Sequence, residues 1–189
     1  MCEYSVKRNG AFNHEILIFV ILKQYNLARP TCRKKRFEGD TIMAYSQREL
    51  LARLIMCEAG GEGDNGMRAV ASVVMNRVNA YSGEYSRISQ GGNMHNVVFQ
   101  PRQFDCSVDV LMGRYNPQNI YNMNPEQIHY DIADWAMAGN RLAGLGTALW
   151  FFNPYSPDCP ETFPSRAGIF IARIGDHCFY IPTEYYYET

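Results

Sequence analysis

Residues 51–78 read LARLIMCEAGGEGDNGMRAVASVVMNRV, a stretch in which two apolar patterns of helical spacing flank a pair of glycines. Apolar side chains that recur every three or four residues form one face of an amphipathic helix. The pair Gly60-Gly61 separates the two patterns, because glycine is unfavourable inside a helix. We therefore expect two helices joined by a short turn at these glycines.

The first helix is expected to begin after Ser46 and to carry an acidic residue on its buried face. Ser46 can cap the helix, and Glu49 three residues later completes the sequence pattern of a capping box. The apolar face comprises Leu50, Leu51, Leu54 and Ile55. Glu58 follows Leu54 by four residues and therefore falls on the same face.

Two further helical regions are expected, separated by a loop. A second helix starts from an Asp64 cap, and a third starts at Asn124-Pro125 and stops at Gly139. Residues 81–96 are rich in Gly, Ser and Asn and are interpreted as a loop. The expected buried residues are Met67, Val70, Ala71, Val74 and Val78 in the second helix, and Ile128, Ile132, Trp135 and Ala136 in the third.

The C-terminal third of the chain changes to strand patterns. Strands are expected at residues 148–152, 168–174 and 177–181, and Gly175-Asp176 suits a tight hairpin turn between the last two. Helices followed by strands indicate an α+β domain.

The N-terminal segment, residues 1–42, differs from residues 43–189 in charge. It holds eight Lys or Arg and four Asp or Glu, and every lysine lies at or before Lys35. Its apolar run, residues 16–22, is far shorter than the roughly 20 residues of a membrane span, so no transmembrane span is expected. We interpret residues 1–42 as an extension or an upstream start, and 43–189 as the folded functional domain. A membrane tether or a contact with an anionic surface is the alternative.

Composition narrows the class of function. The net charge of −1 gives no indication of a nucleic-acid partner. The six cysteines form no CxxC pair, so no structural metal site and no cofactor are expected. Cys159 and Cys178 could form a disulfide, but the sequence leaves that pairing open.

Glu58 is the candidate for chemistry. Burial disfavours the charged form of a carboxyl and raises its pKa, so the group can act as a general acid near neutral pH. The alternative is a structural glutamate paired with Arg53 or Arg77. Glu62 is not expected to form a helical pair with Glu58, because the two glycines intervene, and it is interpreted as a solvated loop residue.

Aromatic residues are concentrated in the later part of the chain and could line a sugar-binding groove. Aromatic faces cover the apolar faces of sugar rings, and the hydroxyls would seek amides such as that of Asn153. The alternative is that these aromatic residues pack within ordinary strands, and for most of the residues we favour this alternative. The candidates are Trp150, Phe151, Phe152, Tyr155, Phe163, Phe179 and Tyr180.

Four motifs in order resemble the SleB/CwlJ-type cell wall hydrolases, a family of spore cortex-lytic enzymes. They are the stretch 51–78, the segment QPRQF at 100–104, ALWFFNP at 148–154 and HCFY at 177–180. The resemblance covers about 130 residues, from Ser46 to Thr183. No N-terminal peptidoglycan-binding module is visible, so the chain is more similar to the short CwlJ branch.

The resemblance implies a fold related to lysozyme and lytic transglycosylases, with a mainly helical lobe and a smaller β-containing lobe. It implies cleavage of cortex peptidoglycan in the spore during germination, with a spore coat protein as a further candidate partner, and Glu58 as the catalytic residue. The short branch tends to have cysteine where Cys159 and Cys178 stand. The expected substrate-binding residues are Asn76, Gln103, Phe104, Trp150, Asn153, His177 and Tyr180.

With Glu58 as the single supported acid, we predict a lytic transglycosylase, in which the sugar's own 6-hydroxyl closes a 1,6-anhydro ring. A muramidase-type hydrolase, which needs a second carboxylate, is the alternative. A thiol peptidase using Cys57 and His177 is disfavoured, because Cys57 is expected to point about 100° away from Glu58 around the helix. A zinc amidase is disfavoured because the four histidines show no HxxxH-like pairing. A non-catalytic cortex- or coat-binding protein with the same fold is the last alternative.

Overall fold

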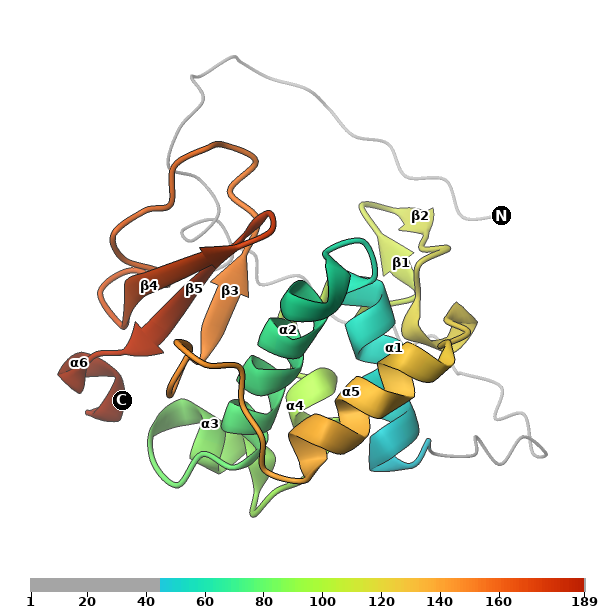
Figure 1. The fold of residues 1–189 in the computed structure, drawn as a ribbon, viewed down its shortest axis with the longest axis horizontal. Coiled ribbons are helices and arrows are strands. Elements are labelled where there is room, and N and C mark those ends of the chain that lie inside the picture. The colour runs from blue at the N-terminus through green and yellow to red at the C-terminus, as the bar shows by residue number, and fades with distance from the viewer. Residues whose placement is uncertain (1–44, 189) are drawn as a thin grey trace, which may run out of the picture. The chain divides into compact units, whose positions relative to one another are not determined.

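The structure, a computed structural model, describes residues 45–188, which form a helical lobe and a smaller β lobe (Figure 1). The expectations for residues 1–42 lie outside this range, and the domain division stays a prediction. The helical lobe contains α1 (Gln47–Ala59), α2 (Gly63–Val78), α3 (Gly83–Ser89), α4 (Met94–Val98) and α5 (Gln127–Met137). The β lobe contains β3 (Trp150–Phe152), β4 (Gly168–Ile174), β5 (His177–Pro182) and the short helix α6 (Glu184–Tyr187). The predicted α+β class is confirmed.

Helix α1 begins and ends where the sequence indicated. The Ser46 hydroxyl accepts the Glu49 N–H at 3.1 Å, and Gly60 is the C-cap. The Glu49 carboxylate does not close the predicted capping box. It instead accepts hydrogen bonds from Arg53 Nε and the Tyr130 hydroxyl, each at 2.6 Å, and so ties α1 to α5.

The starts of α2 and α5 each differ from the prediction by two residues. Helix α2 has Glu62 as its N-cap, and Asp64 lies inside the first turn, where it accepts a hydrogen bond from Arg68 Nε at 2.6 Å. Helix α5 starts after Glu126, whose N–H donates to His129 Nδ1 at 3.0 Å in a reciprocal capping box. This box takes over the capping role that the sequence assigned to Asn124.

The helical core holds the apolar faces of α1, α2, α4 and α5. All of the predicted core residues of α1 and α2 are buried, whereas in α5 only Ile132 and Ala136 are, since Ile128 is exposed and Trp135 is half-buried. The described helices include none long and apolar enough to cross a membrane.

The prediction of a loop at residues 81–96 is wrong, because most of this segment folds into the short helices α3 and α4. Isolated helices of this length are marginal, and most helical stability in proteins comes from tertiary packing. Here that packing comes from Tyr85, Met94, Val97 and Val98, all buried. A small hairpin of β1 (Val110–Leu111) and β2 (Arg114–Tyr115) was also not predicted.

The β lobe is an antiparallel sheet of order β3-β5-β4. The predicted strands are found at nearly the predicted bounds, and the Gly175-Asp176 hairpin is confirmed by the pairing of Ile174 with His177. Gly175 has φ +57°, a conformation that glycine adopts most readily. A disulfide joins Cys159 to Cys178 in the central strand, which settles the pairing that the sequence left open.

The two lobes are joined by polar contacts from α2 to the segment before β3. The Arg77 Nε donates to the carbonyl of Leu149 at 2.6 Å, and the Asn76 Nδ2 donates to the carbonyls of Gly146 and Ala148, both at 3.0 Å. These bonds fix β3 against the helical lobe.

Candidate active site

Glu58 lies in the last turn of α1, where the Gly60-Gly61 turn ends the helix and leaves open space beside it. Its side chain lines two cavities that otherwise have different walls. The helical cavity, about 470 Å³, is bounded by the ends of α1 and α2 and by residues Gln118, Glu126 and His129. The sheet cavity, about 230 Å³, is bounded by residues 103–105 and by side chains of β3 and β5.

The Glu58 carboxyl is largely removed from water. Burial, and to a smaller extent the charge of Asp105, raise its pKa to about 7. A hydrogen bond from the Cys106 thiol to Glu58 Oε1, at 3.4 Å, and the charge of Arg77 act in the opposite direction. The carboxyl is therefore close to half-protonated at neutral pH.

Glu58 forms no ion pair with any arginine of the described residues, so the alternative of a structural ion pair is wrong. Arg53 is paired with Glu49, and Arg77 donates its Nε to the carbonyl of Leu149. Arg77 is buried, with its guanidinium over the rings of Tyr85 and Phe104, and its Nη1 has no hydrogen-bond partner. It lines the sheet cavity and affects Glu58 through its charge alone.

Four of the predicted substrate-binding residues meet at the sheet cavity beside Glu58: Gln103, Phe104, Asn153 and His177. They come from three separate motifs of the sequence, and the fold brings them together. The Gln103 Oε1 accepts the Tyr85 hydroxyl at 3.0 Å, and the Asn153 Oδ1 accepts the Tyr155 N–H at 2.7 Å. Both amides are thus oriented by the protein before any ligand binds.

The other three predicted residues are not among those that line either cavity. Asn76 uses its amide within the fold, where its Nδ2 binds the carbonyls of Gly146 and Ala148 and its Oδ1 accepts Arg141 Nε at 2.7 Å. Trp150 is buried against Tyr85 and Tyr186, and Tyr180 is fully buried with its hydroxyl on the carbonyl of Pro160. These contacts indicate that the three residues stabilise the fold.

The aromatic candidates divide in the same way. Phe151, Phe152 and Tyr155 line the sheet cavity, and Tyr155 is 92% exposed. Phe179 is fully buried in the sheet. Phe163 lines neither cavity and packs against the rings of Phe152 and Tyr180.

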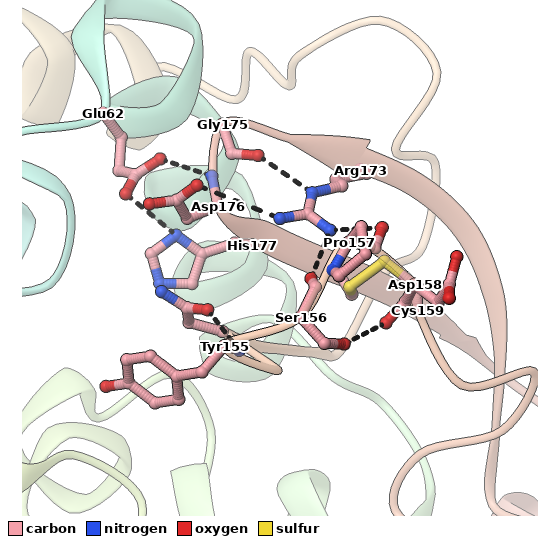
Figure 2. A network of polar contacts seen from close by, with 12 residues as sticks. Glu62, Tyr155, Ser156, Pro157, Asp158, Cys159, Arg173, Gly175, Asp176 and His177 are labelled. Atoms are coloured by element: carbon pink, nitrogen blue, oxygen red, sulfur yellow. Dashed lines mark hydrogen bonds and ion pairs between the residues drawn. A yellow bond between two sulfur atoms is a disulfide. The ribbon is translucent and has the colours of Figure 1, made fainter.

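Glu62 connects the helical lobe to the β4–β5 hairpin (Figure 2). Its Oε2 accepts the Asp176 N–H at 2.8 Å, and its Oε1 lies 3.8 Å from His177 Nδ1, which is too long for a hydrogen bond. Burial lowers the pKa of His177, so the imidazole is neutral near pH 7. The interpretation of Glu62 as a solvated loop residue is therefore wrong.

The hairpin is further held by Arg173 (Figure 2). Its guanidinium donates to the carbonyls of Ser156, Pro157 and Gly175, at 2.8, 2.6 and 3.2 Å. These bonds tie the loop that carries Tyr155 to the hairpin that carries His177. The positions of Tyr155 and His177, which both line the sheet cavity, are thereby fixed relative to each other.

A family model described as Cell Wall Hydrolase matches residues 61–180 of the chain. The chain belongs to the cell wall hydrolase family. The predicted resemblance is confirmed, and so is the expectation of an enzyme that degrades the cell wall. The family match begins after Glu58, so the role of that residue stays a prediction.

Curated relatives of this cell wall hydrolase include two CwlJ proteins. "Cell wall hydrolase CwlJ" of Bacillus subtilis is 30% identical over 135 residues, covering 71% of this chain and 84% of that protein. Its counterpart in Oceanobacillus iheyensis is 32% identical over 136 residues, covering 71% and 86%. Among solved structures, the catalytic domain of the germination-specific lytic transglycosylase SleB from Bacillus anthracis is similar. It has a TM-score of 0.52 and 27% identity, and the match covers 73% of this chain and 98% of that domain.

Three residues near Glu58 in this cell wall hydrolase were not predicted as site residues: Arg77, Asp105 and Cys106. Arg77 belongs to the NRV end of α2, and Asp105 and Cys106 directly follow the QPRQF segment. These three residues could have been predicted from their position within or next to the two motifs. Asp105 is exposed at the sheet cavity, while Cys106 is buried.

Cys57 and His177, the pair required for a thiol peptidase, line different cavities of the cell wall hydrolase. Although the two residues are adjacent on α1, the Cys57 Sγ lies within 4.8 Å of both a Glu58 oxygen and the Cys106 Sγ. The Cys57 thiol donates to the carbonyl of Gln118 at 3.4 Å.

Proposed function

We propose that this chain degrades the peptidoglycan of the spore cortex during germination, by cleaving the glycan bond between N-acetylmuramic acid and N-acetylglucosamine as a lytic transglycosylase. Membership of the cell wall hydrolase family supports the substrate. The similarity to a domain described as a germination-specific lytic transglycosylase supports the reaction and the spore setting. A spore coat protein as partner stays a prediction.

The observation that carries this proposal is a single, largely buried carboxyl, Glu58, shared by two cavities. A general acid works best when its pKa is near the operating pH, because both protonation states are then accessible. With a pKa of about 7, Glu58 can give its proton to the glycosidic oxygen. The resulting carboxylate can then accept the proton of the 6-hydroxyl as that oxygen closes the 1,6-anhydro ring.

The residues around Glu58 provide a surface suited to a sugar. Phe151 and Tyr155 offer aromatic faces at the sheet cavity, and Gln103 and Asn153 offer amides already oriented by hydrogen bonds. Rings bury the apolar faces of sugars, while a small number of fixed polar groups set their orientation. We propose these four residues as the groove contacts, with His177 as a neutral hydrogen-bonding group beside them.

A hydrolase on the same substrate is the second candidate, and one observation favours it. Inverting and retaining glycosidases both use two carboxylates. Glu62 and Glu126 are occupied by the β4–β5 hairpin and by the α5 capping box. Asp105 is exposed, lines the same cavity as Glu58, and is therefore the one available partner among the described acids at this cavity.

The deciding experiment is digestion of cortex peptidoglycan by wild type, Glu58→Gln and Asp105→Asn, with products identified by mass. Glu58→Gln is expected to lose roughly 10²–10⁴-fold in rate, the usual contribution of a general acid. Glu161→Gln, an exposed site outside both cavities, is the matched control and should behave as wild type.

The products separate the candidates. A transglycosylase releases 1,6-anhydro-muramic ends and continues to do so in Asp105→Asn. Plain reducing ends, lost together with activity in Asp105→Asn, would instead establish the hydrolase. Cortex binding by wild type without release of any muropeptide would contradict both and indicate a non-catalytic binding protein.

A further inference from the structure

Two free thiols lie beside the proposed catalytic carboxyl. Cys57 and Cys106 are unbridged, and their Sγ atoms and a Glu58 carboxylate oxygen all lie within 4.8 Å of one another. The Cys106 Sγ is 3.4 Å from Glu58 Oε1. The three residues come from the end of α1 and from the turn that follows the QPRQF segment, 48 positions away in the sequence.

The spacing of these atoms is close to that of a tetrahedral metal site. Zinc binds thiolate at about 2.3 Å and carboxylate at about 2.0–2.2 Å, so tetrahedral ligands stand about 3.6 Å apart for S···O and about 3.8 Å for S···S. The observed S···O distance already lies near this value, and the remaining pairs need to close by no more than about 1 Å. Side-chain rotation alone can supply such a shift, because Cys57 is only half-buried.

The fourth coordination position can be filled from solvent. Cys57 and Glu58 both line the helical cavity, and the Gln118 carbonyl beside the Cys57 thiol lines it as well. A metal ion can therefore enter through this cavity and keep a water molecule on its open side.

We propose that Cys57, Cys106 and Glu58 form a binding site for a soft divalent cation of the Zn²⁺ and Cd²⁺ class, and that its occupation inhibits the enzyme. Binding releases two thiol protons, and the proton of Glu58 where it carries one, and forms two metal–sulfur bonds and one metal–oxygen bond, with no change of oxidation state. The bound carboxylate then has no proton to give to a glycosidic oxygen. The site is thus inhibitory and takes no part in the reaction.

The chemistry of the ligands sets the selectivity of the site. Thiolates favour soft ions, whereas Ca²⁺ requires six to eight oxygen ligands and Mg²⁺ a near-octahedral oxygen shell. Two sulfurs and one carboxylate provide neither. Ca²⁺ and Mg²⁺ are therefore expected to leave both the site and the activity unaffected.

Binding can be tested without any reaction. We would titrate Cd²⁺ into the full chain carrying Cys2→Ser and Cys32→Ser, so that Cys57 and Cys106 are the remaining free thiols, and follow the ultraviolet charge-transfer absorption of cadmium thiolate. One equivalent should bind, and Zn²⁺ should displace it. Cys57→Ser and Cys106→Ser should each weaken binding by more than the roughly 10–100-fold that loss of an outer-shell partner costs.

Inhibition is tested by the ratio of activity with and without Zn²⁺, taken separately for each variant. The ratio should fall towards zero in the parent chain and stay near one in Cys57→Ser, with Ca²⁺ as the control cation. Circular dichroism checks that each variant is folded. If buried Cys106→Ser does not fold, the half-buried Cys57→Ser still decides the outcome.

No cadmium absorption in the parent chain, or equal absorption in Cys57→Ser, would overturn the site itself. The inhibitory role rests on the proposed function of Glu58, whereas the absorption does not. Stoichiometric binding with undiminished activity would therefore keep the site and refute the role of Glu58 as the acid. The two proposals thus fail in distinguishable ways.

Discussion

At the scale of the residue, Glu58 is charged only at a cost in free energy, because its carboxyl is removed from water without gaining an ion pair. Burial is the largest of the influences that bring its pKa to about 7, and the Cys106 thiol reduces the effect without cancelling it. Keeping a buried carboxyl without an ion pair therefore lowers the stability of the fold, and the expected benefit is catalysis. This loss depends on pH and can be measured.

The cost predicts a stability gain in Glu58→Gln that is absent below about pH 4.5 and complete above about pH 7. Because the pKa is about 7 in the fold and 4.5 ordinarily, the stability of wild type is full below pH 4.5, falls between pH 4.5 and about pH 7, and is constant above that. Glutamine has no proton to lose, so at pH 8 the variant should be more stable by roughly 2–3 kcal/mol. Urea unfolding at pH 4 and pH 8 measures this, with Glu161→Gln as control. A gain of equal size at both pH values would contradict the burial account.

At the scale of the element, periodicity and turn residues predicted α1, α2 and all three strands of the sheet. Each of these has a self-contained signal, such as the apolar face of α2 or the Gly175-Asp176 turn. Helices α3 and α4 carry no such signal, because their stability depends on buried contacts such as those of Tyr85 and Met94 with distant parts of the chain.

The same limit applies to the site. Glu58 was found from its helix face, and Gln103, Phe104, Asn153 and His177 from family motifs. The thiol of Cys106 and the carboxylate of Asp105 were not found, because Cys106 lies 48 positions from Glu58 in the sequence and only the tertiary fold brings this segment to the end of α1. Asn76, Trp150 and Tyr180 also lie within family motifs, yet the fold uses their side chains internally.

The β4–β5 hairpin depends on Glu62, and Gly175→Ala tests this link. A Cβ at Gly175 would collide with Glu62 Oε2 and displace the carboxylate from the Asp176 N–H. Gly91→Ala is a matched control, because Gly91 also has positive φ and an added Cβ there meets nothing within 4 Å. Both variants should lose roughly 1–2 kcal/mol for the backbone conformation. Gly175→Ala should lose a further 1.5 kcal/mol or so for the charged hydrogen bond, as measured by urea unfolding.

Activity gives a second comparison for the same pair of variants. Gly175→Ala should also reduce cortex digestion, because the hairpin carries His177 into the sheet cavity. Gly91→Ala should not. Equal stability and equal activity in the two variants would show that the Glu62 link contributes nothing.

The Cys159–Cys178 disulfide is expected to stabilise the β lobe by restricting the unfolded chain. Closing a loop over a sequence separation of 19 residues contributes about 3 kcal/mol by loop entropy. The double variant Cys159→Ala/Cys178→Ala should lose this amount in chemical denaturation. Cys57→Ala, which removes an unbridged thiol, is the control and should lose much less. A double variant as stable as the control would contradict the prediction.

At the scale of the whole molecule, the candidate site is assembled from both lobes of the described chain. The helical lobe supplies Glu58, and the β lobe supplies Asn153 and His177. Contacts through Arg77 and Glu62 hold the lobes in one arrangement. Neither lobe alone contains the proposed acid together with its groove, so the activity is expected to depend on both.

The helical and sheet cavities share Glu58 and otherwise have different walls. A glycan strand that is cleaved at Glu58 therefore has room to continue in both directions. The enzyme should therefore be endo-acting, cutting at internal positions of a long strand instead of trimming its ends. Size-exclusion analysis of early digests would then give fragments of many lengths before small ones accumulate. A steady release of disaccharides from strands of nearly unchanged length would indicate end-directed cleavage and contradict this.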